Sequence, residues 1–347
     1  MTWLVGQLSM LRVAAFTGGK DVPSARYRVR QYIPLLREKG VQLREYSALL
    51  GCYPPASRWF RPFWGAATLA SRLPGVVASF AYDLTLLQRE MVSTFLTTEP
   101  YTKRPRALDV DDAIWLHRRG GLARELARRC DGVICGNAFL AENFLRWNPN
   151  VHLLPTGVDI ERYRPANRAD QPDLLIGWCG TSGNLRELYA IEGSLAKALE
   201  ERSQARLLVI SDKHPQFRTV PAERVLFRPW SPDAEVTGIQ QMAVGIMPLQ
   251  ESLWARGKCS FKMLTYMACE VPVVVSPVGM NSEVLSLGCC GLPALSDRQW
   301  VDALASLLDH PDQRRTMGRT GRQIVEKHYS TRLLAPRFAS ILKSFVA

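Results

Sequence analysis

The sequence predicts an α/β protein of two domains, each a parallel β-sheet with helices on both faces. Three observations indicate this class. The chain has 347 residues, which is long for one domain and natural for two. Short continuous apolar runs alternate with helical patterns along most of its length, as in strands that are buried on both faces. Hydrophobic residues make up 47% of the chain, which is enough for two substantial cores.

The first half contains five expected strands joined by helices. Residues 1–16 include an arginine and run directly into a glycine pair, so we interpret their end as the first strand, with a leader before Met10 left open. Helices are expected at 28–39 and 122–129. The expected strands are 12–16, 83–88, 107–110, 132–135 and 151–154.

A polar, proline-containing stretch at 155–172 is the expected linker, and a second run of strands and helices follows it. The predicted domains are therefore 1–157 and 158–330. One last helix is expected at 331–346, and packing of residues 331–347 back on the first domain is left open. The expected strands are 174–179, 205–211, 224–227, 243–248 and 271–276.

The net charge of +12 lies mostly in the first half, where residues 1–150 carry 21 Lys and Arg against 12 Asp and Glu. An anionic partner is expected, and charge alone does not choose among membrane, acidic glycan and nucleic acid. Bases and aromatics alternate at 58–64, as in an interfacial segment, although core packing with two surface arginines is also open. No nucleic-acid-binding motif is recognisable, so no nucleic acid partner is expected.

Eight cysteines occur without a CxxC pair or zinc-ligand spacing. Most look like small core residues, and several lie in expected strands or helices, which favours a reducing compartment. No uncharged apolar segment reaches the length of about 18 residues that a spanning helix needs. We therefore expect a cytoplasmic protein, with peripheral association at the inner face of the membrane left open.

Arg256, Lys258 and Lys262 stand at an expected helix start between two expected strands. Cations in the first turn of a helix cost roughly 0.3 to 1 kcal/mol each, and a bound anion would reverse this penalty. The amide of Cys259 and the hydroxyl of Ser260 lie at the same helix start. Main-chain N–H groups at such a position favour phosphate. The segment therefore predicts an anion-binding site.

Helical spacing places Lys258, Lys262 and Thr265 on one face and Phe261 and Leu264 on the opposite face. We expect the apolar face to be buried against the sheet and the basic face to be open. Thr265 is a candidate donor to a ribose hydroxyl, with helix packing as the alternative. The alternative for the two lysines is a solvated helix face.

Two further loops follow expected strands. The turn that begins with Gly180 and Thr181 could cradle a phosphate with its amides, or it could be a plain tight turn. Asp109, Asp111 and Asp112 end a strand of the first domain, where close carboxylates raise one another's pKa. They could bind acceptor or sugar hydroxyls and assist proton transfer, hold a metal ion, or cap the next helix.

Taken in order, several segments resemble the GT-B glycosyltransferases, specifically the retaining family 4 group. The resemblance runs nearly end to end. It implies two Rossmann-like domains that face a central cleft, with the acceptor on 1–157 and a nucleotide-sugar on 158–330. The segments are the Gly18-Gly19 loop with 23–28, then 109–115, 155–159, 176–180, 245–249 and 276–279.

The resemblance implies a retaining, hexosyltransferase-type enzyme that moves a sugar from a nucleoside-diphosphate-sugar such as a UDP-sugar to a hydroxyl acceptor. A lipid-linked or glycan acceptor in polysaccharide or glycolipid biosynthesis is expected, and no cofactor is required. The alternatives are a nucleotide-sugar epimerase of the same fold and a non-catalytic nucleotide-sugar-binding module.

The sequence departs from the family pattern at four positions. Gly257 and Thr265 stand where the family has a pair of glutamates, and Thr181 stands where members tend to have an arginine. Glu270 stands where glycine is usual. The diphosphate charge must therefore be met by the basic residues around the expected helix start.

The expected catalytic residues are Lys258, Lys262 and Asp112. No metal ligand is expected. The expected substrate-binding residues are Gly18, Gly19, Arg26, Asp111, Gly180, Thr181, Arg228, Arg256, Cys259, Ser260 and Thr265.

Overall fold

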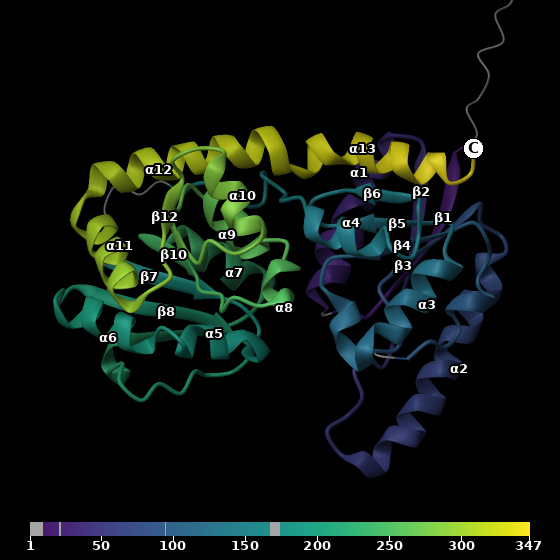
Figure 1. Cartoon of the computed structure of the whole chain (residues 1–347), viewed down its shortest axis with the longest axis horizontal. Helices are drawn as coiled ribbons and strands as arrows, with labels where there is room; N and C mark the ends of the chain where they lie inside the picture. The colour runs from purple at the N-terminus through teal and green to yellow at the C-terminus, as the bar shows by residue number, and fades with distance from the viewer. Residues whose placement is uncertain (1–9, 21, 94, 167–173) are drawn as a thin grey trace, which may run out of the picture. The chain divides into compact units, whose positions relative to one another are not determined.

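The computed structural model describes residues 10–20, 22–93, 95–166 and 174–347 (Figure 1). They form two compact units. Unit 1 comprises residues up to Gly157 together with Thr331–Ala347, and unit 2 comprises Val158–Ser330. The possible leader before Met10 and residues 167–172 of the expected linker lie outside the described residues.

Unit 1 contains a six-stranded sheet in which every neighbouring pair of strands is parallel, in the order β2-β1-β3-β4-β5-β6. The five strands expected from the sequence are confirmed, and β2 was missed because polar residues alternate along this edge strand. The strands are β1 (Leu11–Thr17), β2 (Val41–Ser47), β3 (Leu84–Gln88), β4 (Arg106–Val110), β5 (Gly132–Cys135) and β6 (Val151–Leu153).

The helix expected at 28–39 is instead three short segments. Pro34 cannot donate a main-chain hydrogen bond, so the last segment restarts around it. The helical segments of unit 1 are η1 (Ala25–Val29), η2 (Arg30–Tyr32), α1 (Ile33–Glu38), η3 (Arg58–Phe60), α2 (Arg61–Ser79), η4 (Glu99–Tyr101), η5 (Ile114–Gly120), α3 (Gly121–Arg129), α4 (Ala138–Phe144) and α13 (Thr331–Ser344).

The last helix, α13, completes the core of unit 1. Its residues Leu334, Phe338 and Leu342 are buried in the same hydrophobic cluster as the sheet and α1. The ring of Phe338 meets the ring of Tyr32 edge to face, with 5.4 Å between the centroids. Figure 1 shows α13 lying beside α1.

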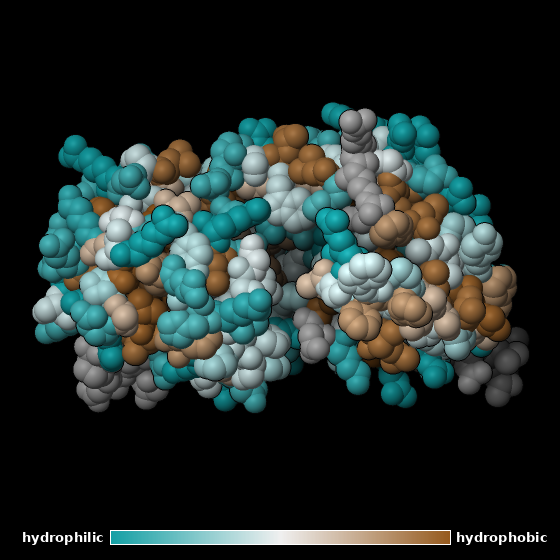
Figure 2. All heavy atoms as spheres, turned by 90° about the horizontal axis from the view of Figure 1, so that it is seen from below, coloured by the Kyte–Doolittle hydropathy of each residue, from teal (hydrophilic) through white to brown (hydrophobic). Residues whose placement is uncertain are grey.

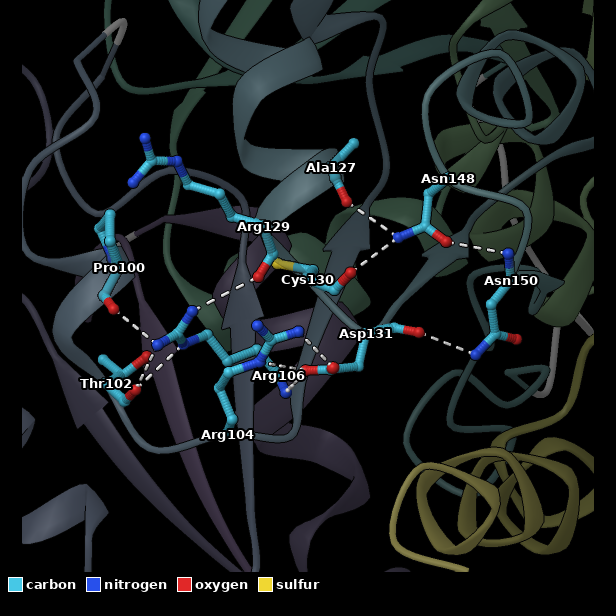
Figure 3. Close-up of polar contacts among 10 residues, drawn as sticks. All are labelled: Pro100, Thr102, Arg104, Arg106, Ala127, Arg129, Cys130, Asp131, Asn148 and Asn150. Atoms are coloured by element: carbon cyan, nitrogen blue, oxygen red, sulfur yellow. Dashed lines mark hydrogen bonds and ion pairs between the residues drawn. The ribbon is translucent and has the colours of Figure 1, made fainter.

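A polar network fixes the amino ends of β4 and β5 (Figure 3). The Arg106 guanidinium donates to the Thr102 carbonyl at 2.7 Å, while its own amide donates to the Asp131 carboxylate at 2.8 Å. Arg104 also donates to Asp131, at 2.5 Å. Asn148 donates to two carbonyls at the end of α3. These contacts tie the segments at the amino edge of the sheet to one another.

Unit 2 contains a second six-stranded parallel sheet in the order β12-β11-β10-β7-β8-β9. The five expected strands are confirmed, whereas the short edge strand β12 was missed. The strands are β7 (Leu174–Cys179), β8 (Ala205–Ser211), β9 (Val225–Pro229), β10 (Val244–Met247), β11 (Val273–Val275) and β12 (Gly291–Pro293).

The core of unit 2 includes the fully buried Trp178 and Trp300. Part of the expected linker belongs to this unit, because Tyr163 is buried and its hydroxyl donates to Glu235 at 3.0 Å. The helical segments are η6 (Ser182–Asn184), α5 (Leu185–Tyr189), α6 (Glu192–Glu200), η7 (Ala222–Arg224), α7 (Pro232–Gln240), α8 (Leu253–Arg256), α9 (Phe261–Ala268), α10 (Met280–Ser286), α11 (Asp297–Asp309), α12 (Pro311–Ile324) and η8 (Val325–Tyr329).

All eight cysteines are free thiols, and all but Cys289 are buried. Burial of most cysteines agrees with their interpretation as small core residues. Within the part of the chain that the structure describes, no helix combines the length and apolar character that crossing a bilayer requires.

Candidate functional site

Each sheet has a point at which the strand order reverses, between β1 and β3 in unit 1 and between β7 and β10 in unit 2. Ligands of open parallel sheets bind outside the carboxyl ends of strands at such points. In unit 2, the loops at this place begin with Gly180 after β7 and Pro248 after β10. The loop after β10 leads through α8 to Lys258 and Lys262.

The loop after β7 is fixed by the end of β8. The Gly180 amide donates to the Ile210 carbonyl at 3.0 Å, and the Asp212 carboxylate accepts from the amide and hydroxyl of Ser182 at 2.6 and 2.7 Å. Burial raises the pKa of Asp212, but the hydrogen bonds from Ser182 outweigh it and the pKa is lowered. Thr181 accepts from Asn184 at 2.9 Å. The loop is thus an ordered structure next to the switch point.

Lys262 lies directly against this loop, in the first turn of α9. Its Nζ is 4.6 Å from the centroid of the Trp178 ring, and a Cβ on Gly180 would lie 2.9 Å from the same Nζ. The side chain is half-buried. Burial and, secondly, repulsion by Lys258 lower the pKa of Lys262 to about 8. Glycine at position 180 is therefore what lets the ammonium approach the main chain.

Lys258 adds a second positive charge at this place. Its Nζ lies 5.0 Å from the centroid of the Trp254 ring. The Lys258 side chain is half-buried and lies in the loop between α8 and α9. Two cations whose ammonium groups lie over tryptophan rings therefore stand near the start of α9, where main-chain amides of the first turn have no acceptor within the helix.

The helix start differs from the expectation. A short helix, α8, ends at Arg256, and α9 begins only at Phe261. Ser252 caps α8 by accepting from the Ala255 amide, while Ser260 adopts a left-handed conformation that separates the two helices. Arg256 is thus at a helix C-terminus, where a cation is favourable. It is exposed and pairs with Glu251 at 2.7 Å.

The prediction that this helix has an open basic face is wrong beyond its first turn. Thr265 is buried, and its hydroxyl donates to the Lys262 carbonyl at 2.8 Å, which corresponds to helix packing and not to the expected ribose contact. Ser260 is also buried and donates to Asn281 at 2.7 Å. Cys259 is buried beside it. The helix packs on its own sheet and on α12, where Met267 meets Gly321, so nearly all of its faces are covered.

Glu270 has a φ of +57°, in the left-handed region that favours glycine. This conformation explains why glycine is usual at this position in the family that the sequence resembles. A glutamate here accepts that backbone strain.

Arg228, an expected substrate-binding residue, is engaged with α7. Its guanidinium donates to Gln241 at 2.9 Å and lies close to Gly238. The neighbouring Trp230 is half-buried and donates to Glu235 at 3.0 Å.

In unit 1, the glycine pair follows β1 at the switch point. Gly19 has a φ of +144°, and a Cβ on Gly18 would lie 2.9 Å from the sulfur of Cys52. Arg26 lies over the ring of Tyr27, 4.3 Å from its centroid. The glycine pair directly follows the carboxyl end of β1, and Arg26 lies in η1.

Asp109 does not face an open site, contrary to expectation. It is fully buried and forms a bidentate pair with Arg28, at 2.5 and 3.1 Å. Arg28 also donates to the Leu154 carbonyl at 2.7 Å. This pair links β4 to the segment after β6 and is therefore structural.

Asp111 and Asp112 share a different partner, Arg89, which sequence reasoning missed. Arg89 contacts them at 3.8 and 3.3 Å and has a φ of +63°. Burial raises the pKa of Asp111 to about 6, against the opposing effect of Arg89. The signal in the sequence was the charged pair Arg89-Glu90 directly after a buried strand. No group of three metal-ligating side chains occurs among the described residues.

Comparisons with known proteins agree with this architecture. Residues 178–310 match the family model of glycosyl transferases group 1. Sucrose-phosphate synthase from Thermosynechococcus elongatus has a TM-score of 0.70 at 16% identity, covering 96% of this chain and 98% of that one. HepE from Anabaena, in complex with UDP and glucose, has a TM-score of 0.70 at 13% identity, covering 96% and 100%. The chain has the GT-B glycosyltransferase fold.

This GT-B chain also resembles a curated relative. D-inositol 3-phosphate glycosyltransferase of Segniliparus rotundus is 24% identical over 194 residues, which cover 49% of this chain and 42% of the relative. The aligned part therefore spans less than half of the relative's length. The predicted GT-B fold is confirmed, and Gly180, Lys258 and Lys262 all lie within the segment that matches the family model.

Proposed function

We propose that this GT-B glycosyltransferase moves a hexose from a nucleoside-diphosphate-sugar to a hydroxyl acceptor with retention of configuration. One observation carries the proposal. Lys262 is a half-buried cation at the switch point of unit 2, and within the described residues it has no salt-bridge partner. Burying a charge without a partner is costly, so such a group is suited to an anionic ligand. A diphosphate supplies that charge.

The donor that we propose first is a UDP-sugar. HepE, a structural neighbour, is solved in complexes with UDP and glucose and with UDP-glucose. In this chain Lys258 and Lys262 would neutralise the diphosphate, and the first amides of α9 would donate to its oxygens. The two lysines would meet the charge that a metal ion meets elsewhere, so we propose that no metal or other cofactor is required.

In the proposed reaction, the bond between the anomeric carbon and the diphosphate oxygen breaks, and the diphosphate leaves with the electron pair. The acceptor hydroxyl attacks the same face of the sugar, and its proton passes to a leaving phosphate oxygen. Lys258 and Lys262 stabilise the charge that develops on the diphosphate. This route needs no separate base, which leaves Asp112 the role of holding an acceptor hydroxyl.

We propose a lipid-linked or glycan acceptor in polysaccharide or glycolipid biosynthesis. WaaG, a glycosyltransferase involved in lipopolysaccharide biosynthesis, has a TM-score of 0.65 at 14% identity, covering 95% of this chain and 99% of that one. The net positive charge of residues 1–150 favours peripheral association with an anionic inner membrane face in a cytoplasmic protein.

Calorimetric titration with UDP, GDP, ADP and dTDP in excess chelator tests the donor site. We expect one nucleotide to bind with micromolar affinity to the wild type and to a Lys197→Met control, an exposed lysine on α6, and to bind weakly to Lys262→Met. Binding that appears only with manganese would move the site to Asp111 and Asp112. Absence of binding under both conditions would favour the non-catalytic module, and free sugar released without an acceptor would favour an epimerase.

A further inference from the structure

The outward face of α2 is apolar. Phe63, Leu69, Leu73 and Val77 are exposed along this helix at spacings of four to six residues, and Phe80 follows directly after it. Their exposed fractions run from 37% to 76%. Three alanines and one proline fill the exposed positions between them, and Arg61, at the first position, is the one exposed charge on the helix. We call these five residues the α2 stripe.

The buried face of the same helix is mostly polar or small, with Val76 as the exception. Thr68, Arg72, Gly75 and Ser79 are all buried. The Arg72 guanidinium donates to three main-chain carbonyls, and a Cβ on Gly75 would lie 3.0 Å from a tyrosine ring. The three carbonyls belong to Thr17, Tyr46 and Met91. These contacts fix which face points outward, so the exposure of the α2 stripe is set by the fold.

This arrangement reverses that of an ordinary surface helix, whose apolar side faces the core. Contiguous exposed apolar patches on folded proteins mark sites of interaction. Figure 2 shows hydrophobic side chains gathered on the unit at the right, which contains α2. The stripe therefore needs an apolar occupant.

Charge and aromatic content identify the occupant. Between Glu45 and Asp83 the sequence contains no acidic residue. Arg58 and Arg61 are exposed at the start of the helix, next to Trp59 and Phe60, whose exposed fractions are 87% and 67%. Arginines beside exposed aromatics and an apolar helix face are typical of helices that lie in the interface of an anionic bilayer. Because the face carries arginines and no acidic residue, its charge complements lipid phosphates.

We propose that η3 and α2 lie flat in the headgroup region of an anionic bilayer, with the α2 stripe facing the acyl chains and Arg58 and Arg61 contacting lipid phosphates. The proposal rests on the membrane association within the proposed function and is independent of sugar transfer. It assigns the contact to one helix of unit 1.

Flotation of the whole protein with vesicles tests the assignment. We expect binding to vesicles of phosphatidylcholine with one quarter phosphatidylglycerol, and much weaker binding to phosphatidylcholine alone. The variant Phe63→Gln/Leu73→Gln/Val77→Gln should lower the partition coefficient at least tenfold, because it removes most of the apolar area that enters the interface. Glutamine is a good helix former, so α2 should persist.

A matched control removes three exposed leucines elsewhere, as Leu145→Gln/Leu287→Gln/Leu295→Gln, and should bind vesicles like the wild type. The Arg58→Gln/Arg61→Gln variant should lose roughly fivefold in affinity per arginine for the anionic vesicles, and its affinity for uncharged vesicles should not change. Calorimetric UDP binding, measured on every variant, reports separately on the donor site and on folding.

Two results would overturn the proposal. One is equal flotation of the wild type and the stripe variant. The other is absence of flotation together with a concentration-dependent dimer that the stripe variant abolishes, since this would make the α2 stripe a contact between copies. If the wild-type protein does not bind UDP, the UDP donor site is refuted, while the flotation result still stands.

Discussion

Removal of the Lys262 charge tests the donor site most directly. The change Lys262→Met keeps an unbranched side chain of similar length in the space between Trp178 and Gly180 and removes the ammonium. At an effective dielectric constant of about 20, two unit charges about 4 Å apart attract by about 4 kcal/mol. Because Lys262 is only half-buried and Lys258 shares the ligand, we expect a loss of about 2 to 3 kcal/mol.

This loss corresponds to UDP binding that is roughly 30- to 150-fold weaker, since about 1.4 kcal/mol is a factor of ten in affinity. Titration calorimetry at pH 7 and low ionic strength measures it directly. The pKa of Lys262 in the empty protein is lowered to about 8, so diphosphate binding above pH 8 should be accompanied by proton uptake. Titrations at pH 9 in buffers of different ionisation enthalpy detect that proton.

Affinity within threefold of the wild type, with no proton uptake at pH 9, would refute the reasoning. Such a result would mean that the diphosphate does not lie against Lys262. The Lys197→Met control should change neither quantity, because its side chain is exposed on α6.

Four further predictions concern catalysis and stability. Lys258→Ala should lower turnover by roughly 10²-fold, the scale of losing one main electrostatic donor, and steady-state sugar transfer measures it. Because the pKa of Lys262 is lowered in the folded protein, the unfolded chain holds this proton more tightly than the folded protein does. The free energy of unfolding should therefore rise between pH 8 and about 10.4. Urea titrations should find a flatter dependence of this free energy on pH in Lys262→Met. Asp109→Ala leaves Arg28 buried without its charge partner and should lower the free energy of unfolding by about 3 to 5 kcal/mol in the same titrations. A much smaller decrease would contradict this prediction. Gly180→Ala should lower the free energy of unfolding by about 1 to 3 kcal/mol in urea titrations, because its Cβ would lie 2.8 Å from the buried Trp178 ring, and its contact with Lys262 should also weaken nucleotide binding in calorimetry.

The strands of both sheets could be predicted where they are continuously apolar. The two missed strands lie at sheet edges, where burial is incomplete and the apolar signal fades: β2 alternates polar residues, and β12 has three residues that are half-buried or exposed. The helix expected at 28–39 divides because Pro34 interrupts its hydrogen bonds.

The candidate site was predictable in its charges and less so in its geometry. Lys258 and Lys262 stand near the start of α9 as expected, but the two-helix path through Gly257 depends on a left-handed Ser260, which no periodicity reveals. Asp109 was misassigned because its partner, Arg28, lies 81 positions away in the sequence. Long-range ion pairs of this kind follow from sheet topology and cannot be predicted from local spacing.

The position of α13 has a consequence for how the chain acquires its structure during synthesis. The core of unit 1 includes Leu334, Phe338 and Leu342, whereas the 173 residues of unit 2, Val158–Ser330, come before them in the chain. A ribosome therefore releases all of unit 2 before it releases the last part of the first core. Unit 2 is continuous and can close on its own, while the nascent unit 1 keeps apolar surface uncovered until the end. We therefore expect the usual order, in which the amino-terminal domain matures first, to be reversed in this protein.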